Sequence, residues 1–208
     1  MRKSINIPNA LTASRILLTP VFMACLFANG WGWKWAALLV FTIASLTDLY
    51  DGYLARRGNS VTTLGRFLDP LADKILASAA LIAFVVVDLV EIWLVIVIVG
   101  RDILVTGFRM YSLYNGRQVV TSKLAKWKTT AQLTVIFLIL TYVSVESTLR
   151  RFAYDGLEEV WVSGVLNGLV GFVALLTVIS AVRYFGGHRE TGSKKQTEIP
   201  RISEVHSG

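Results

Sequence analysis

The sequence predicts an all-α integral membrane protein with six transmembrane helices, preceded by a short interfacial helix at the N-terminus. The chain has 208 residues, of which 54% are hydrophobic, and its mean hydropathy is +0.56. Apolar runs of about 20 residues recur along it, and this length crosses the hydrocarbon core of a bilayer. We expect residues 1–185 to form a single membrane domain. Residues 186–208 are rich in Gly, Lys, Ser and Thr, and we expect them to form a disordered polar tail.

The first half of the chain contains three of the predicted spans. Residues 2–15 mix polar and apolar side chains, which fits an interfacial helix that leads into the membrane. The first span covers about residues 11–28 and contains Pro20, which transmembrane helices tolerate. A turn with interfacial tryptophans follows, and the second span covers about residues 35–53. The third span begins near Pro70 and ends at about residue 87.

The second half contains the other three spans and indicates the orientation. The fourth span covers about residues 92–113, the fifth about 127–145 and the sixth about 160–184, and a polar basic loop precedes the fifth. Six spans return both termini to one side of the membrane. Lys and Arg gather at the termini and after the second and fourth spans, so the positive-inside rule predicts that both termini face the cytoplasm.

Composition argues against several other classes of protein. A single cysteine, Cys25, excludes a disulfide framework. The two histidines, His188 and His206, lie in or near the tail, which argues against a histidine-based metal or general-base site. The net charge of +7 is explained by cytoplasmic loops and attraction to anionic membrane lipid, so we expect no nucleic acid partner.

Four aspartates are the most informative residues of the chain. Asp48 and Asp51 are three residues apart and Asp69 and Asp73 are four apart, so in helices each pair shares one face. The predicted topology places all four at the cytoplasmic side. Converging carboxylates repel one another, and their desolvation near a membrane is costly. Divalent cations resolve both problems, and oxygen-only ligands favour Mg²⁺, Mn²⁺ or Ca²⁺.

The residues around these aspartates match a long, gapped pattern, D-x2-D-G-x2-A-R-x8-G-x3-D-x3-D, over residues 48–73. This pattern resembles the signature of the CDP-alcohol phosphotransferase family, integral membrane enzymes of phospholipid synthesis. The resemblance implies a reaction in which an alcohol attacks a CDP-linked lipid and releases CMP. It implies two Mg²⁺ or Mn²⁺ ions per active site, with Asp48, Asp51 and Asp69 as ligands, and Asp73 as a further ligand and the general base. The expected CDP-lipid-binding residues are Asn9, Thr47, Gly52, Ala55, Arg56 and Gly65.

Basic residues in the fourth span and the following loop form a second candidate group. Arg101 and Arg109 are eight residues apart, so they share one helix face. Arg101 lies about twelve residues before the end of its span, deeper than snorkelling requires. It therefore pairs with Asp102 or the four aspartates, or binds an anionic substrate. The predicted residues for an acceptor phosphate are Arg101, Arg109, Lys123, Lys126 and Lys128.

Three further stretches, residues 6–15, 100–109 and 122–132, resemble the branch of the family that makes phosphatidylglycerophosphate. This resemblance implies CDP-diacylglycerol and sn-glycerol 3-phosphate as substrates. It also implies a multi-pass protein of the bacterial cytoplasmic membrane whose active site faces the cytoplasm. The alternatives are a sister enzyme that accepts inositol phosphate or phosphatidylglycerol, and a divalent-cation transporter. Transport sites usually lie near the bilayer midplane, whereas these aspartates cluster at one face. The sequence leaves a homodimer open.

Overall fold

The computed structural model describes residues 7–55, 63–114, 123–152 and 159–196, and within these ranges all regular secondary structure is helical. This confirms the prediction of an all-α protein. The described helices are α1 (Ile7–Phe27), α2 (Trp31–Ala55), α3 (Thr63–Val86), α4 (Ile92–Tyr114), α5 (Lys123–Arg151) and α6 (Glu159–Gln196).

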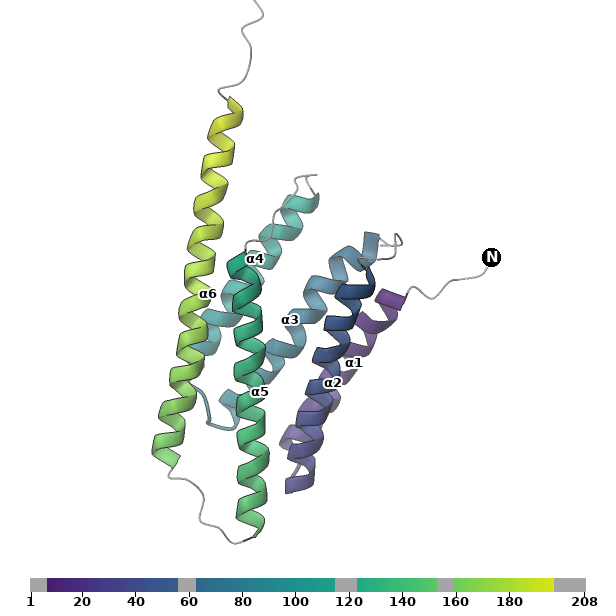
Figure 1. Cartoon of the computed structure of the whole chain (residues 1–208), viewed down its shortest axis with the longest axis vertical. Helices are drawn as coiled ribbons and strands as arrows, with labels where there is room; N and C mark the ends of the chain where they lie inside the picture. The colour runs from purple at the N-terminus through teal and green to yellow at the C-terminus, as the bar shows by residue number, and fades with distance from the viewer. Residues whose placement is uncertain (1–6, 56–62, 115–122, 153–158, 197–208) are drawn as a thin grey trace, which may run out of the picture.

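The helices alternate in direction, so their ends gather in two sets (Figure 1). We call the end where α2 and α4 finish and α3 and α5 begin the upper end, as it lies in Figure 1. At the lower end, α1, α3 and α5 finish and α2, α4 and α6 begin. Helix α1 packs against α2 and α3, α5 packs against α2 and α6, and α4 packs against α3 and α6. The alternation matches the predicted order of spans.

Several described helices carry apolar side chains on the exposed face as well as on the buried face, as expected of a protein surrounded by lipid. On α1, Leu17 is exposed and Phe22 is fully buried, and on α4 the same contrast holds between Ile96 and Ile98. A helix that is hydrophobic all round is typical of a membrane span or of the core of a large protein. A chain of 208 residues is too short to cover so many apolar faces by itself.

Two helical segments, Trp127–Arg151 and Trp161–Arg183, are long and apolar enough to cross a membrane by length and composition. They correspond to the fifth and sixth predicted spans. The first four predicted spans are helices of 21, 25, 24 and 23 residues, and their role as membrane spans stays a prediction.

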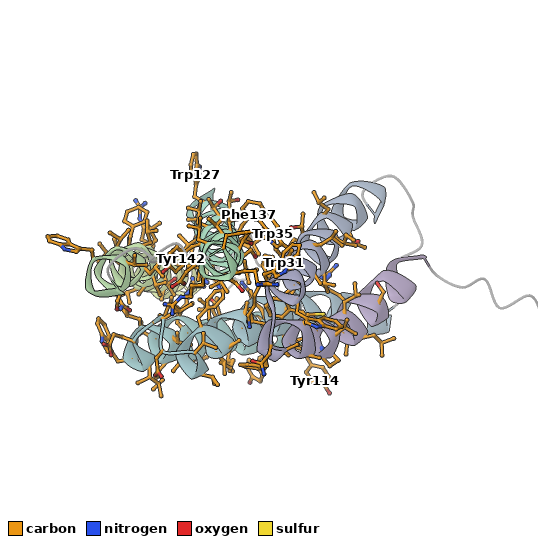
Figure 2. All side chains as sticks on the ribbon, turned by 90° about the horizontal axis from the view of Figure 1, so that it is seen from below. Trp31, Trp35, Tyr114, Trp127, Phe137 and Tyr142 are labelled. Atoms are coloured by element: carbon orange, nitrogen blue, oxygen red, sulfur yellow. The ribbon has the colours of Figure 1, made fainter. Side chains whose placement is uncertain are left out.

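Exposed aromatic side chains are found near both ends of the bundle. Trp and Tyr favour the two membrane–water interfaces, where an apolar ring and a polar edge are both accommodated. Figure 2 shows Trp127 and Tyr114 projecting away from the bundle. The exposed residues near the lower end are Trp31, Trp33, Trp93 and Trp161, and those near the upper end are Tyr111, Tyr114 and Trp127.

Eight described hydroxyl groups inside the helices donate a hydrogen bond within their own helix. A serine or threonine hydroxyl can donate to the backbone oxygen four residues earlier, which removes the cost of an unpaired polar group in an apolar setting. The residues that donate in this way are Thr19, Thr42, Thr47, Thr134, Thr141, Ser144, Thr148 and Thr177. The donor of each of these hydroxyl groups is therefore satisfied without a neighbouring helix, although Ser144 and Thr148 also contact α2.

A polar contact at the lower end joins three helices. The Lys34 ammonium donates to the backbone oxygen atoms of Leu26 and Ala28, where the last turn of α1 leaves carbonyl groups without helical partners. The Ser144 hydroxyl of α5 lies 3.1 Å from the Lys34 backbone oxygen of α2 and 2.8 Å from the Leu140 backbone oxygen, so its single hydrogen is shared between the two acceptors. This contact fixes α1, α2 and α5 relative to one another.

The structure differs from the predicted elements in three places. Residues 7–15, the described part of the segment expected to form a separate interfacial helix, are continuous with the rest of α1, because no helix breaker follows Pro8 before Pro20. Lys123, Lys126 and Lys128, expected in or beside a loop, belong to the start of α5, where Lys, Leu and Ala all favour a helix. Helix α6 continues to Gln196 and enters the expected tail, because a formed helix propagates readily through Arg, Glu, Lys and Gln. Residues 197–208 lie outside the described residues.

Candidate active site

The last turns of α2 carry Asp48 and Asp51, and the first turns of α3 carry Asp69 and Asp73. Both helix ends belong to the upper end of the bundle (Figure 1), so the backbone brings the two pairs to one end, as the sequence predicts. The side chains of these four residues lie outside the described part of the structure. Among the described side chains, no group of three or more His, Cys, Asp or Glu residues is arranged to hold a metal ion.

The residues expected to bind the CDP-lipid are only partly described. Thr47 is a described residue of α2, and its hydroxyl lies 2.7 Å from the backbone oxygen of Ile43 and donates to it. That hydroxyl remains able to accept a hydrogen bond. Asn9, Gly52, Ala55 and Gly65 lie in helices, but their surroundings are outside the described residues, and Arg56 is outside them altogether.

The best described polar site of the bundle is centred on Asp102 of α4, whose side chain is only 2% exposed. The Lys128 ammonium contacts both carboxylate oxygens and lies 2.6 Å from Oδ2. The Arg101 Nη1 atom lies 3.1 Å from Oδ1, and the Lys74 ammonium lies 3.4 Å from Oδ2. We call Lys74, Arg101, Asp102 and Lys128, with Ser180, the Asp102 cluster.

The Asp102 cluster connects four helices. Lys74 belongs to α3, Arg101 and Asp102 to α4, and Lys128 to α5. Helix α6 joins through Ser180, whose hydroxyl oxygen lies 2.8 Å from Arg101 Nη2 and accepts a hydrogen bond from it. Lys74 directly follows Asp73 in α3, so the cluster is attached to a helix that carries two of the four aspartates.

The described part of this cluster carries more positive than negative charge. Three cations contact one carboxylate, which leaves an excess of two positive charges. Lys128 is buried at 1% exposure, whereas the Lys74 side chain is 25% exposed. Buried charge that is not matched by an opposite charge is costly, so this site favours the approach of a further anionic group. Arg and Lys side chains are well suited to bind a phosphate.

The structure tests part of the predicted basic site. The pairing of Arg101 with Asp102, one of the two roles expected for this arginine, is confirmed. Lys128, expected to bind an acceptor phosphate, is 1% exposed and contacts Asp102, and its role toward an acceptor stays a prediction. Arg109, Lys123 and Lys126 lie in α4 and α5, but their side chains are outside the described residues.

Three residues of this region were missed by the sequence reasoning. A signal for Lys74 existed, because a cation directly after an acid in a predicted span is costly and therefore informative. Ser180 gave no signal beyond being polar within an apolar helix. Gln132 lies one helical turn beyond Lys128 and is buried, and its Oε1 atom has no hydrogen-bond partner within the described structure. A buried polar atom of this kind indicates a water molecule or ligand group nearby.

The cluster predicts a ranking of stabilities. Asp102→Asn is expected to lower the free energy of unfolding by about 3–5 kcal/mol, because the neighbouring cations lose their buried counter-charge. Lys128→Met and Lys74→Met should cost less, since Asp102 keeps two cations in either variant. Thermal unfolding of the purified variants in one detergent measures the order.

The matched control is Glu146→Gln, which breaks an ion pair with Arg150 on the same helix, where Arg150 is 57% exposed. An exposed pair contributes about 0–1 kcal/mol, so this variant should unfold close to the unaltered protein. A larger loss for Lys128→Met than for Asp102→Asn would contradict the central role of the carboxylate.

Comparisons with known proteins identify the family of the chain. The family model described as CDP-alcohol phosphatidyltransferase matches residues 5–180. A Bacillus subtilis (strain 168) protein named CDP-diacylglycerol–glycerol-3-phosphate 3-phosphatidyltransferase is 39% identical over 197 residues, covering 89% of this chain and 96% of that protein. A Rickettsia felis protein of the same name is 31% identical over 185 residues, covering 89% of this chain and 96% of that protein. An Arabidopsis thaliana protein, named CDP-diacylglycerol–glycerol-3-phosphate 3-phosphatidyltransferase 2, is 32% identical over 179 residues, covering 79% of this chain and 76% of that protein.

Proposed function

The chain belongs to the CDP-alcohol phosphatidyltransferase family, and we propose that it transfers the phosphatidyl group of CDP-diacylglycerol to sn-glycerol 3-phosphate. The products are phosphatidylglycerophosphate and CMP. The observation that carries the proposal is the excess of positive charge in the Asp102 cluster, beside a helix that bears two of the four aspartates. An acceptor that carries a phosphate needs such a site, whereas an uncharged alcohol does not. The names of the relatives support the same reaction.

The proposed chemistry is a displacement at the phosphatidyl phosphorus. The acceptor hydroxyl oxygen forms a bond to this phosphorus, and the bond from phosphorus to the bridging diphosphate oxygen breaks. That oxygen leaves with CMP. The hydroxyl proton passes to a carboxylate, for which we propose Asp73, the last aspartate of the signature that resembles the family pattern.

Divalent cations fit the residues of the upper end. The backbone brings four aspartates there, and carboxylate oxygens are the ligands that Mg²⁺ and Mn²⁺ prefer. We propose that Asp48, Asp51, Asp69 and Asp73 hold two such ions. When bound, the ions supply neutralisation of the diphosphate charge and alignment of the attacking and leaving oxygens.

The two substrates would then occupy different sets of helices. The proposed CDP-lipid side comprises Asn9 of α1, residues at the end of α2, and Arg56 and Gly65. The proposed acceptor side comprises Arg101, Arg109, Lys123, Lys126 and Lys128 of α4 and α5. A phosphate dianion on that side would offset the excess charge of the Asp102 cluster. Its hydroxyl would point toward α3, the helix of the proposed base.

The proposal predicts which alcohol supports turnover. Purified protein in detergent, supplied with CDP-diacylglycerol and Mg²⁺, should release CMP with sn-glycerol 3-phosphate. Glycerol, which lacks the phosphate, should give little CMP because it cannot use the cationic site. Inositol phosphate and phosphatidylglycerol complete the panel. Release of CMP with either of these, and none with sn-glycerol 3-phosphate, would identify a sister enzyme instead.

The metal site predicts the effect of neutralising its ligands. Asp48→Asn, Asp51→Asn and Asp69→Asn should each remove nearly all turnover, because the loss of one carboxylate leaves an ion under-coordinated and the phosphates unaligned. Thermal unfolding should show that each variant remains folded. Near-normal turnover in any one of them would argue against the two-ion site, and Glu146→Gln serves as an acid-to-amide control away from the upper end.

The charge distribution predicts the orientation in the membrane. We propose that the upper end and both termini face the cytoplasm, because Lys and Arg gather in residues 1–15, 56–66 and 115–128. In a Cys25→Ala background, single cysteines at Gly58 and Asn29 can be labelled in intact cells with a membrane-impermeant thiol reagent. Labelling is expected at residue 29 and not at residue 58. The reverse pattern would overturn the orientation.

A further inference from the structure

We infer that Asp102 is a positioning residue for the acceptor: its carboxylate fixes the spacing between α3, which carries the proposed base, and the basic face of α4 and α5. The inference rests on the proposed function. An acceptor that spans two groups must have its hydroxyl at the base and its phosphate at the cations simultaneously, and a small misplacement of either group is costly to the rate. The contact that sets this spacing is the bridge from Lys74 through Asp102 to Lys128.

The bridge has a defined geometry. The Lys128 ammonium lies 2.6 Å from Asp102 Oδ2, and the Lys74 ammonium lies 3.4 Å from the same oxygen on the side of α3. Arg101 holds the other oxygen at 3.1 Å and reaches Ser180 on α6 at 2.8 Å. One carboxylate therefore fixes side chains from three helices directly and from a fourth through Arg101.

The exposures of the two lysines separate their roles. Lys128 is 1% exposed, and its ammonium is held in place by the Asp102 carboxylate. We therefore expect Lys128 to attract the acceptor phosphate through its charge. Lys74 is 25% exposed and lies on α3, the helix that carries the proposed base, so its ammonium remains partly accessible to a bound group. Asp102 thus connects an inner cation to an outer one across the boundary between the two halves of the proposed site.

A purely structural role would not need this arrangement. Apolar side chains of similar volume commonly hold helices together at least as well as a buried ion pair. The cluster also leaves a polar atom unsatisfied, because Arg101 Nε is buried without a hydrogen-bond partner in the described ranges. A cluster selected only for packing would remove such groups, whereas a site that receives a polar substrate retains them.

The test uses the double variant Asp102→Asn/Lys128→Met. This change removes one negative and one positive charge, so the excess of two positive charges in the cluster is unchanged. The bridge between α3 and α5 is lost. The control is Glu146→Gln/Arg150→Met, which likewise replaces an acid by its amide and a cation by Met, in an ion pair near the lower end of α5.

We expect the double variant to raise the KM for sn-glycerol 3-phosphate about tenfold or more, while the KM for CDP-diacylglycerol stays within about twofold. Asp102→Glu keeps the carboxylate charge, so its KM for sn-glycerol 3-phosphate should lie between those of the unaltered protein and the double variant. The control double variant should match the unaltered protein in both constants. An unchanged acceptor KM in the double variant, or a raised donor KM with the acceptor spared, would overturn the inference.

A second variant decides the question if the double variant does not fold. Lys74→Met leaves Asp102 paired with Arg101 and Lys128 and changes a partly exposed side chain, so it should fold. It too should raise the acceptor KM selectively, and an unchanged acceptor KM would overturn the inference. Failure of the proposed function is detected in a different experiment, the acceptor panel with unaltered protein, where CMP would be released only with another acceptor. The role of Asp102 is then decided by the KM for that acceptor.

Discussion

The burial of a single carboxylate among several cations constrains the upper half of this bundle. A charge that is removed from water must keep its partners at hydrogen-bond distance, because each loss of contact is costly in a low-dielectric setting. Asp102 places this requirement on α3, α4 and α5 together, and Arg101 extends it to α6. The apolar core can tolerate small shifts between helices, whereas the ion pairs cannot. The positions of α3 to α6 near the upper end are therefore set by charge as well as by packing.

The arrangement divides the site between two groups of helices. The four aspartates belong to α2 and α3, both of which contact α1, whereas most of the proposed acceptor residues belong to α4 and α5. Lys74 of α3 and Asp102 of α4 are the residues that join the two groups. Asp102 pairs with the buried Lys128 through a carboxylate that is not part of the aspartate signature. In the proposed function, the four aspartates therefore need not supply the counter-charge of Lys128.

Much of the fold could be predicted because the signals are local. The length of each apolar run gives a helix, and the spacing of Asp48, Asp51, Asp69 and Asp73 places the pairs at helix ends without any knowledge of packing. The start of α5 was misjudged because its lysines look like a loop by polarity, although their intrinsic preference is helical. The extension of α6 was missed for the same reason.

The Asp102 cluster could be predicted only in part, because its members are far apart in sequence. Neighbouring positions suggested the Arg101–Asp102 pair, but the contact between Asp102 and Lys128 joins residues 26 positions apart on different helices. Nothing in the local pattern says which of several lysines reaches the carboxylate. Three-dimensional packing decides this, and it also decides that Lys128 is the buried one.

The hydroxyl groups that donate within their own helices have a consequence for how the protein is made. The hydroxyl groups of Thr141 and Thr177 donate to the backbone oxygen four residues earlier, so neither residue brings an unpaired donor into an apolar setting. The donors of these hydroxyl groups therefore need no neighbouring helix when their own helix enters a bilayer. Asp102 and Lys128 differ, because each finds its partner on another helix. In the proposed six-span topology, Asp102 of α4 would enter the bilayer before its Lys128 partner of α5 has been synthesised. The same ion pair would then couple the insertion of these two helices.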